Sequence, residues 1–97
     1  MIMVLIAYDV NTETTQGKRR LREISKKCED FGQRVQNSVF ECLIDFSQWP
    51  VLKHDLINII DDKTDSLRFY FLGSNWERRI EHVGAKPTYN PEGFLSI

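Results

Sequence analysis

The order of apolar patterns along the 97 residues predicts an α+β fold with one sheet and two helices. An unbroken apolar run at residues 1–9 has the length and character of a strand buried on both faces. Two stretches, at 18–31 and 49–60, repeat apolar residues at helical spacing, while runs at 39–45 and 66–73 have the composition and length of strands. A short extended run at 34–35 leads into the first of these strands through a tight turn at 36–38. Strand, helix, hairpin, helix and strand in this order predict a ferredoxin-like βαββαβ sandwich.

The first apolar run also limits the class of protein. It is shorter than the ~20 residues that cross a membrane, and no basic segment precedes it as in a secretory signal. We therefore expect a cytoplasmic protein with no membrane partner. Cys28 and Cys42 lie within apolar patterns and lack metal-ligand spacing, so we expect two reduced thiols in the core.

Each helix has its own start and stop signals. A polar loop at 10–17 offers several N-caps for the first helix, and Gly32 is expected to be its C-cap. Ser47 and Gln48 before Pro50 predict the cap of the second helix. The two apolar stripes consist of Leu21, Ile24, Cys28 and Phe31 in the first helix, and of Leu52, Leu56, Ile59 and Ile60 in the second.

The end of the chain has a different character. Residues 78–84 are expected to form a short fifth strand, and residues 85–97, interrupted by Pro87 and Pro91, have no apolar period. We therefore divide the chain into a domain at 1–84, which includes this C-terminal strand, and a C-terminal tail at 85–97.

The sheet is expected to have a second covered face. Two helices can cover one face, yet the first strand is apolar on both, and the last places Tyr70 and Leu72 on the uncovered side. We infer a homodimer with facing sheets, in which the two copies of Asp9 approach the twofold axis.

Basic residues are concentrated in one part of a chain whose net charge is −1. Residues 17–34 carry seven basic and three acidic side chains. Cations at a helix start oppose the helix dipole unless an anion binds there, so this cluster is a candidate phosphate-binding surface, and a solvated charged face is the alternative. The candidate nucleic-acid-binding residues are Lys18, Arg19, Arg20, Arg22, Lys26 and Arg34; of these, Arg19, Arg22 and Lys26 are expected to form a basic ridge opposite the apolar stripe.

Asp9, at the end of the first strand, has two interpretations. A single aspartate after a strand commonly forms a turn. In the dimer, however, two Asp9 carboxylates would suit a hydrated Mg²⁺ (or Mn²⁺), which activates water for phosphodiester cleavage. No general base stands at a motif spacing from Asp9.

Three motifs in this order resemble one known family. Tyr8-Asp9 ends the first strand, Lys18-Arg19-Arg20-Leu21 begins the first helix, and Arg34-Val35-Gln36-Asn37-Ser38-Val39-Phe40-Glu41 spans the hairpin. Together they resemble the CRISPR-associated protein 2 family, the small partner of the CRISPR integrase. Val83-Gly84-Ala85-Lys86-Pro87 is similar to a subset associated with a type I system, and the resemblance extends to about Pro87.

The resemblance implies a homodimer whose last strand crosses to the partner's sheet. It implies that Asp9 is a metal-binding, catalytic aspartate with Tyr8 beside it, and that Arg20, Arg34 and Phe40 assist; Ser38, in the same run, is added as a supporting residue. Members are described as metal-dependent endonucleases acting on RNA or double-stranded DNA. They are also described as non-catalytic scaffolds that hold the spacer duplex between integrase dimers.

Two hypotheses follow, and both assign the chain to CRISPR adaptation as a dimer that binds nucleic acid with the integrase. In the first, the dimer is also an Mg²⁺-dependent endonuclease; in the second, it is a purely structural scaffold in which Asp9 is incidental. A ligand-regulated or RNA-binding domain of the same fold has less support, because no aromatic pair is spaced as in an RRM.

Overall fold

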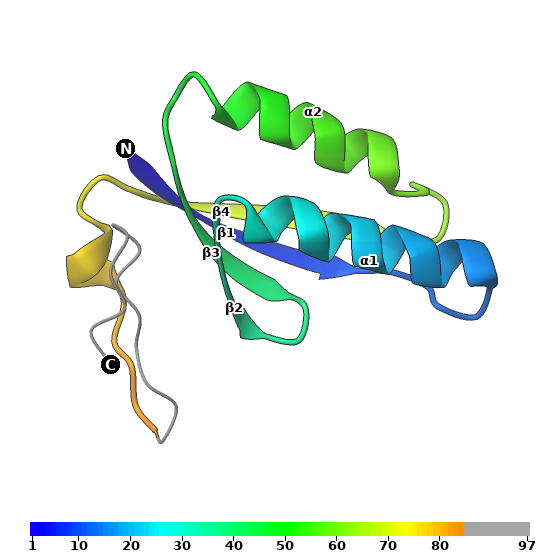
Figure 1. Ribbon diagram of the computed structural model, residues 1–97. Helices are drawn as coiled ribbons and strands as arrows, with labels where there is room; N and C mark the ends of the chain where they lie inside the picture. The colour runs from blue at the N-terminus through cyan, green and yellow to red at the C-terminus, as the bar shows by residue number, and fades with distance from the viewer. Residues whose placement is uncertain (85–97) are drawn as a thin grey trace.

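Residues 1–84, which the computed structural model describes, form a four-stranded antiparallel sheet with two helices on one face (Figure 1). The strand order β2-β3-β1-β4 and the order of elements along the chain confirm the predicted βαββαβ sandwich. The strands are β1 (Ile2–Asp9), β2 (Gly32–Gln36), β3 (Val39–Ile44) and β4 (Ser66–Gly73), and the helices are α1 (Thr15–Glu29) and α2 (Trp49–Ile59). No helix in this part of the chain is long and apolar enough to cross a bilayer.

β1 lies at the centre of the sheet and divides its side chains between two faces. Ile2, Val4, Ile6 and Tyr8 point toward the helices and belong to the main core cluster. The opposite face, called here the outer face, carries Met3, Leu5, Ala7 and Asp9 by the alternation of the strand. Met3 is fully buried, Leu5 and Ala7 are half-buried and Asp9 is exposed.

α1 begins three residues before its first basic residue. The Thr14 side chain caps it by accepting a hydrogen bond from the Gly17 amide at 3.0 Å. Gly17 is buried, and a Cβ atom there would lie 1.9 Å from the Asn11 carbonyl oxygen, so only glycine lets the β1–α1 loop approach the helix this closely.

The predicted C-cap of α1 is wrong. The helix ends at Glu29 with Asp30 as its cap, and Gly32 is the first residue of β2. A glycine is still required there, because a Cβ atom would lie 2.0 Å from the Glu41 carbonyl oxygen on β3. Phe31 lies beyond the helix but packs against the core, as its place in the apolar stripe predicted.

The predicted hairpin is confirmed, and α2 begins where the Ser47-Gln48 cap and Pro50 predicted it, with Gln48 rather than Ser47 as the N-cap. A two-residue turn, Asn37–Ser38, joins β2 to β3. α2 begins at Trp49 with Gln48 as its N-cap, and no side chain forms a cap hydrogen bond, so Ser47 is not the cap. The Trp49 ring packs edge-on against Phe69 and Phe71, with centroid separations of 4.9 and 5.5 Å, and fixes this end of the helix over β4.

No fifth strand forms at residues 78–84. Trp76–Arg79 instead form a short 3₁₀ helix, η1, and residues 80–84 have no strand partner within the described chain. A strand needs a hydrogen-bonded neighbour, which the sequence pattern alone does not supply. The predicted tail at 85–97 lies outside the described residues.

The Asp65 carboxylate connects the loops at one end of the sheet. Its side chain is completely buried, and Arg20 Nε donates to it at 2.8 Å. It also accepts from the backbone amides of Asn11 and Asp61, both at 3.0 Å, and from the Thr64 hydroxyl at 3.0 Å. Burial raises the pKa of Asp65, but the Arg20 guanidinium and the other donors outweigh it and lower the pKa to about 2.

Asp65 predicts a specific loss of stability in acid. Because its pKa falls from 3.8 to about 2 on folding, ionised Asp65 stabilises the fold by about 2 kcal/mol above about pH 4, and this contribution is lost as the pH falls to about 2. Asp65→Asn should be less stable than wild type at neutral pH, and the difference should shrink in acid. Urea unfolding at several pH values measures both effects.

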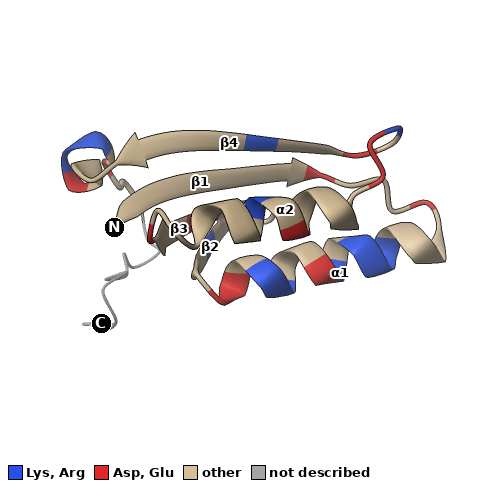
Figure 2. Ribbon diagram, turned by 90° about the horizontal axis from the view of Figure 1, so that it is seen from above, with Lys and Arg blue, Asp and Glu red and all other residues tan. Residues whose placement is uncertain are grey.

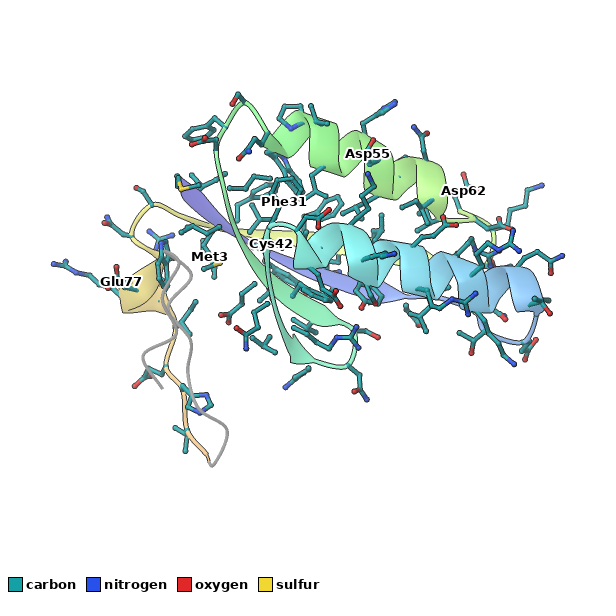
Figure 3. The ribbon with its side chains drawn as sticks, in the orientation of Figure 1. Met3, Phe31, Cys42, Asp55, Asp62 and Glu77 are labelled. Atoms are coloured by element: carbon teal, nitrogen blue, oxygen red, sulfur yellow. The ribbon has the colours of Figure 1, made fainter. Side chains whose placement is uncertain are left out.

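Asp62→Asn is the matched control for this experiment. Asp62 lies in the same loop, just beyond the C-terminal end of α2 (Figure 3), and is exposed. The control should unfold like wild type at each pH. A difference between wild type and Asp65→Asn that stays constant down to pH 2 would contradict the role given to the Asp65 charge.

Candidate metal and nucleic-acid site

Asp9 stands at the C-terminal end of β1 on the outer face, opposite Ser66 of β4. It is exposed, and its carboxylate makes no hydrogen bond or ion pair within residues 1–84. Carboxylate oxygens are the ligands that Mg²⁺ prefers, commonly one or two per ion beside several waters. The donor type fits, but within the described chain no group of three or more potential metal-ligating side chains comes together. Asp9 therefore presents a single available carboxylate.

Tyr8 points to the other side of the sheet, as the next residue in a pleated strand must. It is buried, with 5% of its surface exposed, and its ring stacks on Phe40 at a centroid separation of 6.3 Å. Its hydroxyl lies 2.9 Å from Ser25 Oγ and 3.4 Å from the Asn37 carbonyl oxygen. With Ser25 donating to Tyr8 and Tyr8 to Asn37, all three groups are satisfied. Tyr8 and Asp9 of one chain therefore do not face a common point.

The basic residues of α1 fall into two groups. Lys18, Arg19, Arg22 and Lys26 are exposed and form no ion pair within the described residues. Arg20, in contrast, is largely covered and bound to Asp65 at the base of the helix. Figure 2 shows basic positions recurring along α1, while β1 carries acidic colour at its tip. The N-terminal end of α1 and the end of β1 lie on the same side of the molecule (Figure 1).

Arg34 lies on β2 over the buried Phe40 ring, with its guanidinium carbon 5.3 Å from the ring centroid. It donates to the Asn37 carbonyl oxygen at 3.4 Å and lies 3.9 Å from the Glu29 carboxylate. Both partners of this ion pair are about half exposed, so the pair holds the guanidinium weakly. Ser38 contributes through its backbone, since its carbonyl oxygen accepts from the Tyr8 amide at 3.0 Å.

Farther along β1 from Asp9, apolar and polar side chains lie side by side on the outer face. Leu5 of β1 is flanked by Glu41 of β3 and Tyr70 of β4. Burial raises the pKa of Glu41, and the nearby charge of His82 lowers it in part. On β4, Arg68 donates to the Tyr70 hydroxyl at 3.2 Å.

The predicted residues thus form separate groups. Tyr8, Arg34 and Phe40 meet between α1 and the hairpin, whereas Asp9 lies across the sheet from them. Sequence reasoning missed Ser25 and Asn37, which bind the Tyr8 hydroxyl, and Asp65, which binds Arg20. A hydroxyl next to the apolar stripe at Ser25 was the one available signal. The core thiols are as predicted: both are free and buried, and hydrogen bonding to Cys28 together with burial raises the pKa of Cys42.

Fold and site together define a ferredoxin-like domain that combines a cation-rich helix with an exposed strand-end carboxylate. Comparison with known proteins identifies the family. Residues 1–80 match the family model described as CRISPR associated protein Cas2, and this chain belongs to that family.

Relatives and solved structures agree with this assignment. The chain is 59% identical to the CRISPR-associated endoribonuclease Cas2 of Nitratidesulfovibrio vulgaris, over 99% of this chain and 94% of the relative. It is 50% identical to the CRISPR-associated endonuclease Cas2 of Halalkalibacterium halodurans, over 97% and 98% of the two chains. The crystal structure of Streptococcus pyogenes Cas2 at pH 6.5 shares 60% identity at a TM-score of 0.74, covering 84% of this chain and 99% of that one.

A further similarity concerns an assembly. A chain of a structure described as a partial Cas6-RT-Cas1–Cas2 complex aligns with a TM-score of 0.64 and 25% identity. The match covers 86% of this chain and 91% of that one.

The position of Tyr8 predicts that its hydroxyl supports the fold. Tyr8→Phe removes the partner of the buried Ser25 hydroxyl and one of the two donors to the Asn37 carbonyl oxygen, which keeps Arg34, and it should lower the free energy of unfolding by about 1–2 kcal/mol. At temperatures where the variant is folded, any cleavage activity should change by less than about tenfold, because the hydroxyl faces away from Asp9. Urea unfolding and single-turnover assays measure the two effects.

Tyr70→Phe is the control, since it removes an exposed hydroxyl that interacts with Arg68. It should change stability by less than about 0.5 kcal/mol. A Tyr8→Phe protein that keeps full stability but loses cleavage would instead assign the hydroxyl to catalysis.

Proposed function

We propose that this chain acts in CRISPR adaptation as a homodimer that binds nucleic acid along α1 and cleaves phosphodiesters with Mg²⁺ (or Mn²⁺) at Asp9. The observation that carries the proposal is the exposed Asp9 carboxylate, which makes no hydrogen bond within residues 1–84. It ends β1, and that end lies on the same side of the molecule as the start of α1, the helix that carries Lys18 and Arg19 (Figure 1). The relatives named endoribonuclease and endonuclease support an activity on nucleic acid. The assembly with Cas1 supports the integrase as a partner.

The outer face supports the dimer. Both helices lie on the other side of the sheet, leaving Leu5, Ala7 and Val39 half-buried and Tyr70 43% exposed. In addition, β4 is an edge strand of the described sheet, and an edge presents unpaired backbone groups to a second chain. A second copy covering this face would bring a second Asp9 toward the first and supply the carboxylate that one chain lacks.

The basic part of α1 supports nucleic-acid binding. Lys18, Arg19, Arg22 and Lys26 are exposed on one helix without carboxylate partners in the described chain. Cations so placed are available to phosphates, which supply most of the affinity for nucleic acid. Arg20 is occupied by Asp65; in this proposal it positions the helix, and its contact with nucleic acid remains a prediction.

Asp9 has the properties that a metal ligand requires. It is accessible, free of internal hydrogen bonds in the described chain and fixed by the central strand. A bound Mg²⁺ or Mn²⁺ would supply a Lewis acid and a more acidic water. RNA and double-stranded DNA are both substrates to test, because the names of the relatives differ on this point.

Asp9→Asn should reduce Mg²⁺-dependent cleavage at least about 100-fold, because it removes the charge that binds the cation while keeping the shape of the side chain. Single-turnover cleavage of labelled RNA and duplex DNA, with and without EDTA, measures this. The variant should unfold like wild type, since Asp9 is exposed at the end of its strand.

Asp62→Asn, an exposed aspartate in the α2–β4 loop, is the matched control and should keep full activity. Cleavage that persists in Asp9→Asn would show that the activity belongs to another site or to a contaminant.

A scaffold without catalysis is the second candidate. It is favoured by the single carboxylate at the site, because no group of three metal-ligating side chains forms in the described chain. The likeness to a chain of a Cas1–Cas2 assembly gives it further support. In this case Asp9→Asn supports normal spacer acquisition in cells, whereas a catalytic role in acquisition makes the variant inactive there.

Charge reversal at the start of α1 should weaken duplex binding in either case. The variant Lys18→Glu/Arg19→Glu should lose at least about tenfold in affinity for duplex DNA. The slope of the logarithm of its binding constant against the logarithm of the salt concentration should be less steep by about 2, because two phosphate contacts are lost. Fluorescence anisotropy over a range of salt concentrations measures both.

The matched control is Lys53→Glu/Lys63→Glu, which changes two exposed lysines on α2 and the following loop. Equal losses in the two variants would indicate a nonspecific charge effect.

A further inference from the structure

A groove of about 540 Å³ lies between α1 and the β2–β3 hairpin. Arg22, Ser25, Lys26 and Glu29 line it from one face of the helix, while Arg34, Asn37 and Ser38 line it from the hairpin. Its volume falls in the range of small-molecule sites, about 300–1,000 Å³. Arg22 and Lys26 are also among the α1 cations proposed above to bind nucleic acid, but no role has been given to the cavity itself.

The groove carries three cations and one acid, and the acid lies beside one of the cations, Arg34. Arg22 and Lys26 are exposed cations on α1, and Arg34 faces them from β2. Glu29 is the acid at the C-terminal end of the helical wall, about 10 Å from Arg22 at 1.5 Å per residue but beside Arg34. The Arg34–Glu29 contact is long, at 3.9 Å, and exposed, so an incoming phosphate can displace it.

Hydrogen bonds hold the floor and one wall of the groove in place. The buried Tyr8 and Ser25 hydroxyls join β1 to α1, and the Asn37 carbonyl oxygen accepts from both Tyr8 and Arg34. The turn backbone is therefore fixed, whereas the Asn37 side-chain amide is exposed and makes no hydrogen bond within the described residues. A free amide at the mouth of a groove can read the donors and acceptors of a base edge.

These features match the parts of one nucleotide. The cations Arg22, Lys26 and Arg34 suit a phosphate. The Glu29 carboxylate suits ribose hydroxyls or an exocyclic amine. The Leu21 side chain and the aliphatic parts of Arg22 and Lys26 form an apolar wall for the base. About 10 Å of helix accommodates one unpaired nucleotide and is too short for a stretch of duplex.

We propose that the α1–hairpin groove binds a single unpaired nucleotide, with its phosphate among Arg22, Lys26 and Arg34 and its base or sugar toward Asn37 and Glu29. The proposal rests on the nucleic-acid role proposed above and adds to it a site for a strand end or an unpaired position. A free nucleotide and a nucleotide within a strand share this chemistry, so both are tested.

The experiment follows backbone amide NMR signals of the full chain during titration. The probes are 5′-AMP, adenosine, inorganic phosphate and a 5′-phosphorylated RNA tetramer. We expect AMP or the tetramer to shift the Asn37, Ser38 and Ser25 signals, with adenosine and phosphate each at least about tenfold weaker. Saturation by AMP at concentrations no higher than the tetramer requires indicates a free nucleotide as the source; tighter binding of the tetramer indicates a strand.

Asn37→Asp places a negative charge in the groove without changing the size of the side chain. It should weaken binding of the preferred probe at least about tenfold. Asn75→Asp, which adds the same charge to an exposed asparagine before η1, should leave it unchanged. Both variants should bind duplex DNA like wild type, because the Lys18 and Arg19 side chains are intact.

Three outcomes overturn the proposal. They are the absence of a shift at Asn37 and Ser38 with both AMP and the tetramer, inorganic phosphate binding as tightly as AMP, and an unchanged affinity of Asn37→Asp for the preferred probe. Failure of the groove leaves duplex binding and cleavage intact in wild type. Failure of the nucleic-acid role is distinct, because wild type then binds neither duplex nor single strand.

Discussion

The buried Asp65 carboxylate is the interaction on which the arrangement of the candidate site depends. It joins the β1–α1 loop through Asn11, α1 through Arg20 and the α2–β4 loop through Asp61. The loop that follows Asp9 and the helix that carries the cations are therefore held by one group. Removing Arg20 would leave the buried Asp65 carboxylate without its cation, which costs several kcal/mol. The Arg20–Asp65 pair is therefore expected to stay formed in the folded chain. Arg20 thus helps to hold the exposed cations of α1 in place through its contact with Asp65.

The sheet separates two kinds of chemistry. On the helix side, Tyr8, Ser25 and Arg34 build a polar layer around the start of the hairpin. On the outer side, Asp9 is available to solvent at the end of the same strand. Substitutions at Tyr8 are therefore expected to act through packing and hydrogen bonding, and substitutions at Asp9 through the proposed binding of a cation.

Periodicity predicted the order of the elements and the two apolar stripes, because these depend on local alternation and burial. It failed where the decisive contact is distant in sequence. Gly32 is a residue type that often caps helices, but here it lies against the Glu41 backbone on a neighbouring strand. The sequence does not distinguish Arg20 from Arg19, because Asp65, the partner of Arg20, is 45 residues away. The strand expected at 78–84 lacks a neighbour in the described chain, and no local pattern provides one.

The opposite orientations of Tyr8 and Asp9 place a limit on how β1 can vary in length. Its side chains alternate strictly, so deleting or inserting one residue between Ile2 and Tyr8 would exchange the two faces from that point onward. The Asp9 carboxylate would then enter the space beside Phe40 that Tyr8 occupies, and the phenol would move to solvent. Changes of one residue within β1 are therefore expected to disrupt both faces. Only an insertion or deletion of an even number of residues would keep Tyr8 on the helix side and Asp9 on the outer side.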